Sequence, residues 1–225
     1  MVILETINLG KIYGKKQTKV DALKDVNLKI DKGEFVAIVG PSGSGKSTFL
    51  HLIGGLERPS NGTIKVDNKD ICCLSEGELA KYRRQKVGFV FQQYNLIPVL
   101  NVKENIELPL KLDNQKIDKE YIEDLMKLLG IEDRKNHLPN QLSGGQQQRV
   151  AIARALANKP SIILADEPTG NLDSKTTEEV MDLLKQSIKK YNQTLIMITH
   201  NNEIAKKADR VISIIDGKLN NKISV

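Results

Sequence analysis

A glycine-rich stretch at residues 40–48, with the sequence GPSGSGKST, constrains this chain more than any other feature. It follows the apolar run 35–39, which predicts a buried strand, and it precedes apolar residues within 49–53 that are spaced as in a helix. Strand, glycine-rich loop, Lys-Ser and helix in this order form the phosphate-binding motif G-x-x-x-x-G-K-[ST]. The glycines let backbone N–H groups point at a bound anion, which also faces the positive end of the helix dipole. A glycine-rich turn without a ligand is the alternative, and the match of both the motif and its setting disfavours it.

Two side chains of this loop carry chemistry beyond the backbone. Lys46 is expected to reach the β- and γ-phosphates of a nucleotide, and the Ser47 hydroxyl is expected to ligate Mg²⁺. The predicted nucleotide-contacting residues of the loop are Gly40, Pro41, Ser42, Gly43, Ser44, Gly45, Lys46, Ser47 and Thr48.

Length and composition indicate a globular protein. The chain has 225 residues, enough for one well-buried domain or two small ones. Hydrophobic residues make up 40% of it and charged residues 28%, as in ordinary soluble domains. No apolar stretch approaches the roughly 20 residues that a membrane-spanning helix needs. Residues 1–6 lack the basic start of a signal peptide, so we expect a cytoplasmic location.

The formal net charge is +6, which could suit nucleic acid or an anionic membrane face. The lysines are scattered, however, and pairs such as Lys15-Lys16 and Lys206-Lys207 are typical of solvated surface, so nucleic acid is not an expected partner. Cys72 and Cys73 are adjacent, which fits neither a zinc site nor a disulfide framework, and we expect reduced thiols.

The apolar pattern predicts two kinds of sheet. Residues 2–9, 20–30 and 63–66 are predicted as strands of a small antiparallel sheet, and the second and third of them alternate. Four later runs are nearly continuous, as in strands buried on both faces of a parallel sheet, and they cover residues 87–91, 162–165, 195–198 and 211–215. An amphipathic helix through residues 180–191 separates two of these runs, which indicates right-handed crossovers and a doubly wound α/β sheet.

The segment between Gln92 and Pro160 has a different pattern. Helical stripes run through residues 122–129, ending at Gly130, and through residues 150–157. No convincing strand interrupts them, so this segment is predicted to be a helical insert in the α/β core.

Polar groups follow directly after four predicted core strands: the loop 40–48, Gln92, the pair Asp166-Glu167, and His200. Ligands of open α/β sheets lie outside the carboxyl ends of the strands, so these groups are expected at one edge. Asp166 suits a carboxylate that holds Mg²⁺ through water, and Glu167 suits a general base that polarises water toward the γ-phosphate. Helix capping is the alternative for an acidic pair after a strand, and the phosphate-binding loop earlier in the chain disfavours it.

A second anion-binding helix start is predicted at residues 142–146, LSGGQ. Ser143 is a good N-cap, and Gly144 and Gly145 leave backbone N–H groups bare. Because this element lacks a lysine and lies in the helical insert, it is expected to serve a nucleotide held by another subunit. An ordinary capped helix after a glycine turn is the alternative.

The chain resembles the ATPase subunits of ABC transporters over nearly its whole length. The family's elements occur in order: Tyr13 matches the aromatic residue that stacks on adenine, residues 40–48 the Walker A motif, Gln92 the Q-loop, Leu142 to Gln146 the signature, Asp166 and Glu167 the Walker B pair, Asn171 to Asp173 the D-loop, and His200 the switch histidine. The resemblance implies an α/β fold, namely a P-loop NTPase (RecA-like) core with a mainly parallel sheet, a small antiparallel β subdomain and an inserted α-helical subdomain. It also implies one domain over residues 1–225, with the core at 1–91 and 158–225 and the helical subdomain at 92–157.

The resemblance further implies the roles of the site residues. Those expected to act in catalysis are Glu167, His200, Gln92 and Lys46, and those expected to hold Mg²⁺ are Ser47, Gln92 and Asp166. ATP contacts are expected from Tyr13, residues 40–48, Gln92, Ser143, Gly144, Gly145, Gln146, Asp166 and Asp173. Two copies would bind two ATP between them. Residues Gln92 to Glu104 would dock a separate transmembrane permease at the cytoplasmic face of the membrane.

Finer features at residues 90–98 and 165–173 resemble the lipoprotein-release and macrolide-export branch, which also includes antimicrobial-peptide resistance transporters. The expected function is an ATP-driven motor for export or extraction of a substrate. A regulatory ATPase that signals across the membrane, as in the cell-division relative, is the alternative. DNA-repair and ribosome-acting ABC ATPases are disfavoured, because the interval 92–142 is short and lacks heptads, and because the chain has one phosphate-binding loop.

Overall fold

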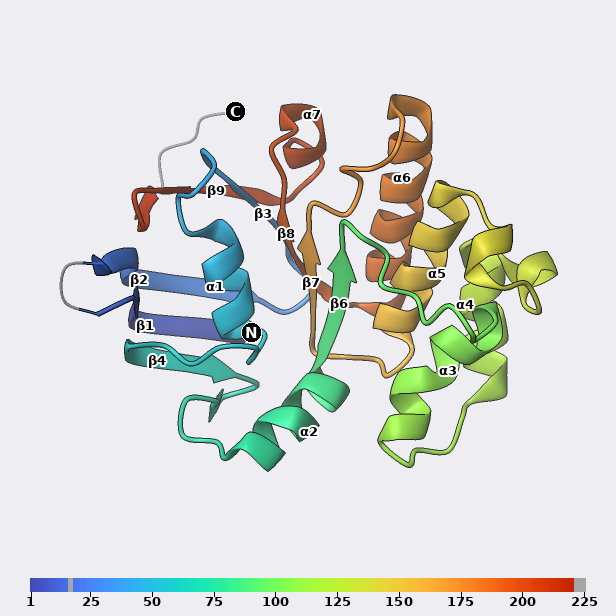
Figure 1. The fold of residues 1–225 in the computed structure, drawn as a ribbon, viewed down its shortest axis with the longest axis horizontal. Helices are drawn as coiled ribbons and strands as arrows, with labels where there is room; N and C mark the ends of the chain where they lie inside the picture. Colours follow the sequence, from blue (N-terminus) through green and yellow to red (C-terminus); the bar gives the residue numbers. More distant parts are fainter. Residues whose placement is uncertain (16–17, 221–225) are drawn as a thin grey trace. The chain divides into compact units, whose positions relative to one another are not determined.

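The computed structural model describes residues 1–15 and 18–220. The chain forms two compact units, and Figure 1 draws their helices and strands. The first unit consists of residues 1–83 and the segment that starts at 194, and the second consists of residues 84–193. Each unit is described by itself below.

An antiparallel sheet opens the first unit. Its strands are β1 (Val2–Tyr13), β2 (Val20–Asp31), β4 (Asn61–Val66) and β5 (Lys69–Asp70), in the order β2-β1-β4-β5. Alternate side chains such as Leu4, Val26 and Ile30 are fully buried on one face, as period-two patterning requires. The predicted small antiparallel sheet is therefore present, and β1 continues beyond the predicted end as far as Tyr13.

The second sheet of this unit is mainly parallel. Its strands are β3 (Phe35–Val39), β8 (Thr194–Ile198), β9 (Arg210–Ile215) and β10 (Lys218–Asn220), in the order β10-β9-β3-β8. Strand β3 pairs in parallel with both β8 and β9, whereas β10 forms an antiparallel edge on β9. Helix α1 (Lys46–Ile53) follows β3, and the short helix α7 (Asn202–Ala205) follows β8. Phe49, Leu50, Leu52 and Ile53 of α1 are fully buried in the core of this unit.

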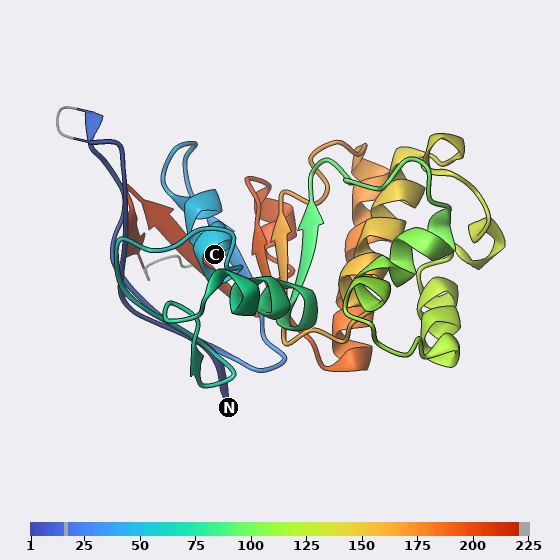
Figure 2. The same ribbon diagram turned by 60° about the horizontal axis from the view of Figure 1, so that its bottom comes forward.

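The second unit combines two parallel strands with a group of helices. The strands are β6 (Val87–Phe91) and β7 (Ile162–Asp166), which pair from Val87 opposite Ile162 to Phe91 opposite Asp166. The helices are α3 (Val102–Leu112), α4 (Lys119–Leu128), α5 (Gly144–Leu156) and α6 (Ser174–Tyr191), with short 3₁₀ turns η2 (Glu132–Arg134) and η3 (Pro139–Gln141). Helix α5 packs against α3 and α6, and Figure 2 shows α5 and α6 side by side. Helix α2 (Glu76–Lys86) leads from the first unit into the second.

The strands that the apolar runs predict are all present, and so are the helices at the predicted stripes. Helices α2 and α3 and the short edge strands β5 and β10 are additional elements that the sequence patterns did not predict. Residues 92–157 contain helices and no strand, as expected, within the part of the chain that the structure describes. The division into a core at 1–91 and 158–225 and a helical subdomain at 92–157 stays a prediction. No helix among residues 1–15 and 18–220 is both long and apolar enough to cross a membrane.

Candidate functional site

The phosphate-binding loop of the first unit closes around its own lysine. The Lys46 side chain is 9% exposed, and its Nζ donates to the carbonyl oxygens of Gly40 at 2.9 Å and of Pro41 at 2.8 Å. These bonds hold the ammonium group inside the loop. Gly45, the N-cap of α1, has φ 105°, and a Cβ there would meet the Ala22 carbonyl oxygen, so only glycine fits.

A buried hydroxyl in the same loop fits an anion ligand. Ser44 is 4% exposed, and among the described residues its Oγ has no hydrogen-bond partner. A buried polar atom without a partner is costly, so an acceptor oxygen from a bound phosphate would stabilise it. The exposed Ser47 lies in the first turn of α1, where backbone N–H groups lack intrahelical partners. The loop therefore fits the phosphate chain of a nucleotide.

Tyr13 is held at the end of β1 by a carboxylate. Its hydroxyl donates to Glu57 Oε2 at 2.7 Å, and Lys11 Nζ lies 5.0 Å from the ring centroid and 3.1 Å from the same Glu57 oxygen. Burial and the hydrogen bond to Glu57 raise the pKa of Tyr13. Burial alone would raise the pKa of Glu57, but hydrogen bonds from Tyr13 and Lys11 and the Lys11 charge lower it overall. The ring is 36% exposed and fixed in place, as a stacking platform for a base requires.

His200 leaves the same sheet edge as the phosphate-binding loop. Ile38 of β3 pairs with Ile198 of β8 in parallel, and Thr199 N donates to Ile38 O at 3.2 Å. His200 follows and is exposed. The N-cap of α7 is Asn201, whose Oδ1 accepts from the backbone of Glu203 at 2.9 Å. The cap of this helix start is therefore Asn201 and not His200.

The second unit places the other predicted catalytic groups at one strand edge. Phe91 pairs with Asp166 in parallel, so Gln92 and Glu167 both follow the carboxyl ends of adjacent strands. Glu167 has φ 46°, a left-handed conformation that costs a non-glycine residue about 1–3 kcal/mol. A turn supports it, because the Gly170 N–H donates to the Glu167 carbonyl oxygen at 3.0 Å.

A fully buried glutamine of α5 supports the same turn. Gln148 Nε2 donates to the Pro168 carbonyl oxygen, one residue beyond Glu167. Sequence analysis missed Gln148, which lies just before the predicted helical stripe at residues 150–157. Gln92 also contacts this loop, through two hydrogen bonds with Asn171.

The predicted signature element is a capped helix start. Ser143 Oγ accepts from Gln146 N at 3.3 Å, and Gln146 Oε1 accepts from Ser143 N at 2.9 Å, which forms a capping box on α5. A Cβ on Gly144 would lie 2.7 Å from the Tyr94 hydroxyl, so the helix start tolerates no side chain there without a shift. The glycine N–H groups and the helix dipole give it the features of an anion site.

Asp173 caps the neighbouring helix. Its carboxylate accepts from Thr176 N at 2.9 Å and from Thr176 Oγ1 at 2.7 Å, and these bonds lower the pKa of Asp173. The predicted ATP contact of Asp173 therefore has a structural role beside it.

The predicted docking segment is tied to the signature helix by an arginine that sequence reasoning missed. Arg154 of α5 donates to the carbonyl oxygens of Tyr94 at 2.8 Å and of Asn95 at 2.6 Å. Beyond this grip, Ile97 and Val99 are 38% and 80% exposed. Exposed apolar side chains in a segment that a half-buried guanidinium holds in place fit a protein partner.

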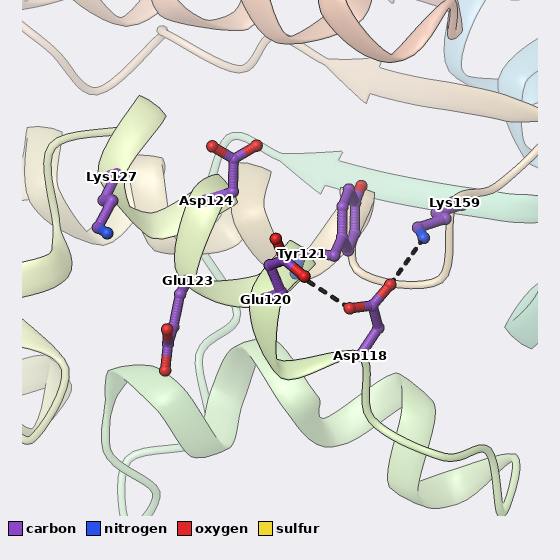
Figure 3. A pocket seen from close by; sticks show the side chains of 7 residues that line it. All are labelled: Asp118, Glu120, Tyr121, Glu123, Asp124, Lys127 and Lys159. Carbon is purple, nitrogen blue, oxygen red and sulfur yellow. Dashed lines mark hydrogen bonds and ion pairs between the residues drawn. The ribbon is translucent and has the colours of Figure 1, made fainter.

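The surface of the second unit also has a hollow of about 560 Å³ beside α4, away from the predicted motifs in sequence. Figure 3 shows Asp118 and Asp124 among the residues around it. These carboxylates are paired, Asp118 with Lys159 at 3.1 Å and Asp124 with Lys190 at 2.6 Å. The charges satisfy one another, so the hollow carries no assigned function.

The predicted residues thus fall into two groups. Tyr13, the loop 40–48 and His200 belong to the first unit, and Gln92, the signature, Asp166, Glu167 and Asp173 belong to the second. The meeting of both groups around one nucleotide stays a prediction.

Comparisons with known proteins bear on the whole chain. A family model described as ABC transporter matches residues 23–170. The chain is 51% identical over 219 residues to the ABC transporter ATP-binding protein MJ0796 of Methanocaldococcus jannaschii, covering 94% of this chain and 93% of that protein. It is 44% identical over 221 residues to the bacitracin export ATP-binding protein BceA of Halalkalibacterium halodurans, covering 97% and 87% of the two chains.

A third relative is a longer protein. The macrolide export ATP-binding/permease protein MacB of Bdellovibrio bacteriovorus is 45% identical over 215 residues, which cover 96% of this chain and 33% of MacB.

Solved structures of ABC transporter ATP-binding proteins also match the chain over nearly its whole length. A dimeric structure of MJ0796 matches with a TM-score of 0.87 and 48% identity over 97% of each chain. A second dimer of MJ0796, in a post-hydrolysis state bound to ADP and Pi, matches with a TM-score of 0.85 and 46% identity, over 99% of this chain and 100% of the other. The predicted fold class is confirmed.

Proposed function

Because the chain belongs to the ABC transporter family and is an ATPase, we propose that two copies of it close around two ATP and drive a separate transmembrane permease. The observation that carries this proposal is the presence of two anion-binding helix starts on one chain, of which only α1 has a lysine. The signature helix α5 would supply its N–H groups to the γ-phosphate of ATP on the other copy. The dimeric structures of MJ0796 support the two-copy arrangement.

Hydrolysis would use Glu167 as the general base. Its carboxylate takes a proton from water as the water oxygen bonds to the γ-phosphorus, and the bond from that phosphorus to the β,γ-bridging oxygen breaks. The products are ADP and inorganic phosphate. Lys46 would neutralise charge on the β- and γ-phosphates, and His200 would donate a hydrogen bond to the γ-phosphate.

Oxygen donors suited to Mg²⁺ are present in both groups of residues. The Ser47 hydroxyl, the Asp166 carboxylate and the Gln92 carboxamide are the hard oxygen ligands that Mg²⁺ prefers, so these residues would hold it. Mg²⁺ supplies positive charge that stabilises the phosphate oxygens.

The permease would dock on residues 92–104, at the cytoplasmic face of the membrane. Arg154 supports this choice, because it links the carbonyl oxygens of Tyr94 and Asn95 to the helix that begins with the signature. A displacement of the docking segment by the permease would therefore be transmitted through Arg154 and helix α5 to Ser143, the N-cap of that helix. The similarity to BceA and MacB, which are named for bacitracin and macrolide export, supports export as the direction of transport.

The experiment compares ATP turnover of the purified chain with turnover of the same chain bound to its cognate permease in lipid vesicles. The permease is expected to stimulate turnover. Arg154→Lys should lose that stimulation while keeping basal turnover, because lysine has a single donor atom in place of the two guanidinium nitrogens that separately bond the Tyr94 and Asn95 carbonyl oxygens. Arg149→Lys, on the same helix and able to keep its ion pair with Glu179, is the matched control. Full stimulation of Arg154→Lys would refute this route of coupling.

A further inference from the structure

Gln92 and Asn171 bind each other in both directions, although they lie 79 residues apart in the chain. Gln92 Nε2 donates to Asn171 Oδ1 at 3.2 Å, and Asn171 Nδ2 donates to the backbone carbonyl oxygen of Gln92 at 3.0 Å. Both residues belong to the second unit, where β6 and β7 pair in parallel just before them. The structure thus ties the Q-loop glutamine to the residue two positions before Asp173.

These two bonds fix the orientation of both carboxamides. The oxygen and nitrogen of a carboxamide look alike, so its orientation follows from its hydrogen-bond partners. A backbone carbonyl oxygen can only accept, so the atom of Asn171 that faces Gln92 O must be Nδ2. Asn171 Oδ1 is then the atom that faces the side-chain carboxamide of Gln92. Because Oδ1 can only accept a hydrogen bond, Gln92 must direct its Nε2 toward it. The oxygen Oε1 is consequently the Gln92 atom that Asn171 does not use.

Gly170 confines the same side chain from another direction. A Cβ at Gly170 would lie 2.7 Å from Gln92 Nε2, 3.0 Å from its Cδ and 3.2 Å from its Cγ. The Gln92 side chain therefore lies against the bare backbone of residue 170. Among the described residues, no hydrogen bond engages Gln92 Oε1, so the atom that metal chemistry needs is left available.

We propose that Asn171 is a positioning residue that holds Gln92 with its carboxamide oxygen, rather than its nitrogen, available to Mg²⁺. This inference rests on the proposed role of Gln92 as a magnesium ligand. Mg²⁺ binds oxygen and not an amide nitrogen, so a carboxamide turned the wrong way contributes nothing. Asn171 removes the wrong orientation by occupying Nε2. It acts through Gln92 and needs no contact with nucleotide or metal.

A purely structural role for Asn171 makes a different prediction. If Asn171 only braced the loop after Glu167, its loss would weaken nucleotide binding with and without metal alike. A positioning role affects only the part of the affinity that Mg²⁺ adds. The ratio of the Kd without metal to the Kd with Mg²⁺ separates the two, and it requires no turnover.

The experiment measures this ratio for β,γ-imido-ATP by isothermal titration calorimetry, in EDTA and in excess Mg²⁺. Gln92→Ala removes the proposed Mg²⁺ ligand altogether and therefore defines the largest decrease expected in the ratio of the two Kd values. Asn171→Ala is expected to lower the ratio by about three- to tenfold, the effect of one lost hydrogen bond, and to leave the Kd in EDTA unchanged. In the Gln92→Ala background, Asn171→Ala should change nothing further, because there is no side chain left to orient.

Two further variants sharpen the result. Gly170→Ala keeps Asn171 but pushes the Gln92 carboxamide out of its place, and it should lower the ratio as Asn171→Ala does. Asn136→Ala removes an exposed asparagine from a turn elsewhere in the second unit and should leave the ratio unchanged.

The outcomes separate the inference from its premise. An unchanged ratio in Gln92→Ala would refute the metal role of Gln92 and the inference with it. A lowered ratio in Gln92→Ala with an unchanged ratio in Asn171→Ala would refute the inference alone. Equal weakening of both Kd values in Asn171→Ala would show a structural brace and also refute it.

Discussion

Replacing Tyr13 with Ala is expected to raise the Kd for ATP by about 5- to 150-fold, because stacking of a base on an aromatic ring contributes about 1–3 kcal/mol and 1.4 kcal/mol is tenfold. The structure supports this range, since the ring is 36% exposed and is held at the hydroxyl by Glu57 at 2.7 Å. Lys11 Nζ lies over the ring, 5.0 Å from its centroid. The matched probe is inorganic tripolyphosphate, which lacks a base and should bind Tyr13→Ala as it binds the wild type.

The anchor of the ring makes a smaller contribution. Tyr13→Phe keeps the ring and loses its hydrogen bond, and Glu57→Gln keeps an acceptor and loses the charge. Because these groups are partly exposed, each change should contribute no more than about 1 kcal/mol, or about fivefold in the Kd for ATP. Tyr13→Trp should restore stacking. An unchanged Kd for ATP in Tyr13→Ala would show that Tyr13 is packing, and an equal loss for tripolyphosphate would show a damaged loop instead.

Two substitutions and one labelling experiment test other groups. Lys46→Ala should weaken ATP binding and abolish phosphate release, because the loop loses the cation it encloses; undiminished turnover would overturn the assignment of the loop. His200→Ala should reduce turnover by about 10²- to 10³-fold, the range typical of losing a transition-state hydrogen bond, while the Kd for ATP stays unchanged; near-normal hydrolysis would exclude a catalytic role. Burial raises the pKa of Cys72 to about 11 from 9.0, so iodoacetamide at pH 8 should label the exposed Cys73 and spare Cys72, as mass spectrometry would detect. A raised folded-state pKa also means that this thiol's contribution to stability is complete below pH 9.0 and is lost as the pH rises toward about 11; equal labelling of both cysteines at pH 8 would contradict the shift.

Local patterns were enough to predict most of the fold. The run 35–39 is apolar because its strand is buried on both sides. The glycines of 40–48 are predictable because the loop backbone has positive φ values there, which strain any other residue. Helix α2 escaped prediction because its sequence, EGELAKYRRQK, is largely charged and buries only Leu79 and Tyr82. The edge strands β5 and β10 have two and three residues, too few to show a period.

Helix α3 escaped for a different reason. In the sequence, Asn105 interrupts the apolar pattern and is typical of a loop. In the structure it is buried in the helix, where its carboxamide accepts a hydrogen bond from Ile97 N at 2.8 Å and donates one to Leu100 O at 2.8 Å. Polar groups satisfied by a preceding loop carry no periodic signal.

The site shows the same limit. Motif residues such as Gln92 and Glu167 are predictable because each directly follows an apolar strand. The contacts of Asn171 with Gln92, of Gln148 with Pro168 and of Arg154 with Tyr94 are not predictable, although Asn171 lies in the D-loop motif, because they join segments distant in the chain. Such contacts depend on tertiary packing, and a single sequence holds no record of which polar side chain reaches which carbonyl oxygen.

The most direct test of the two-copy site uses Glu167→Gln on a sizing column with and without ATP. Glutamine keeps the shape of Glu167 and cannot accept the proton, so ATP should stay bound, and the loss of a negative charge beside the triphosphate should favour closure further. ATP should therefore shift this variant from monomer to dimer, and adding Ser143→Arg should abolish the dimer by blocking the second anion site. Ser75→Arg, which removes a comparable capping box with Glu78 at the start of α2, is the matched control and should leave the dimer intact. A Glu167→Gln variant that stays monomeric with ATP at high protein concentration, or a dimer that survives Ser143→Arg, would contradict the proposal that each nucleotide is held by two copies of the chain.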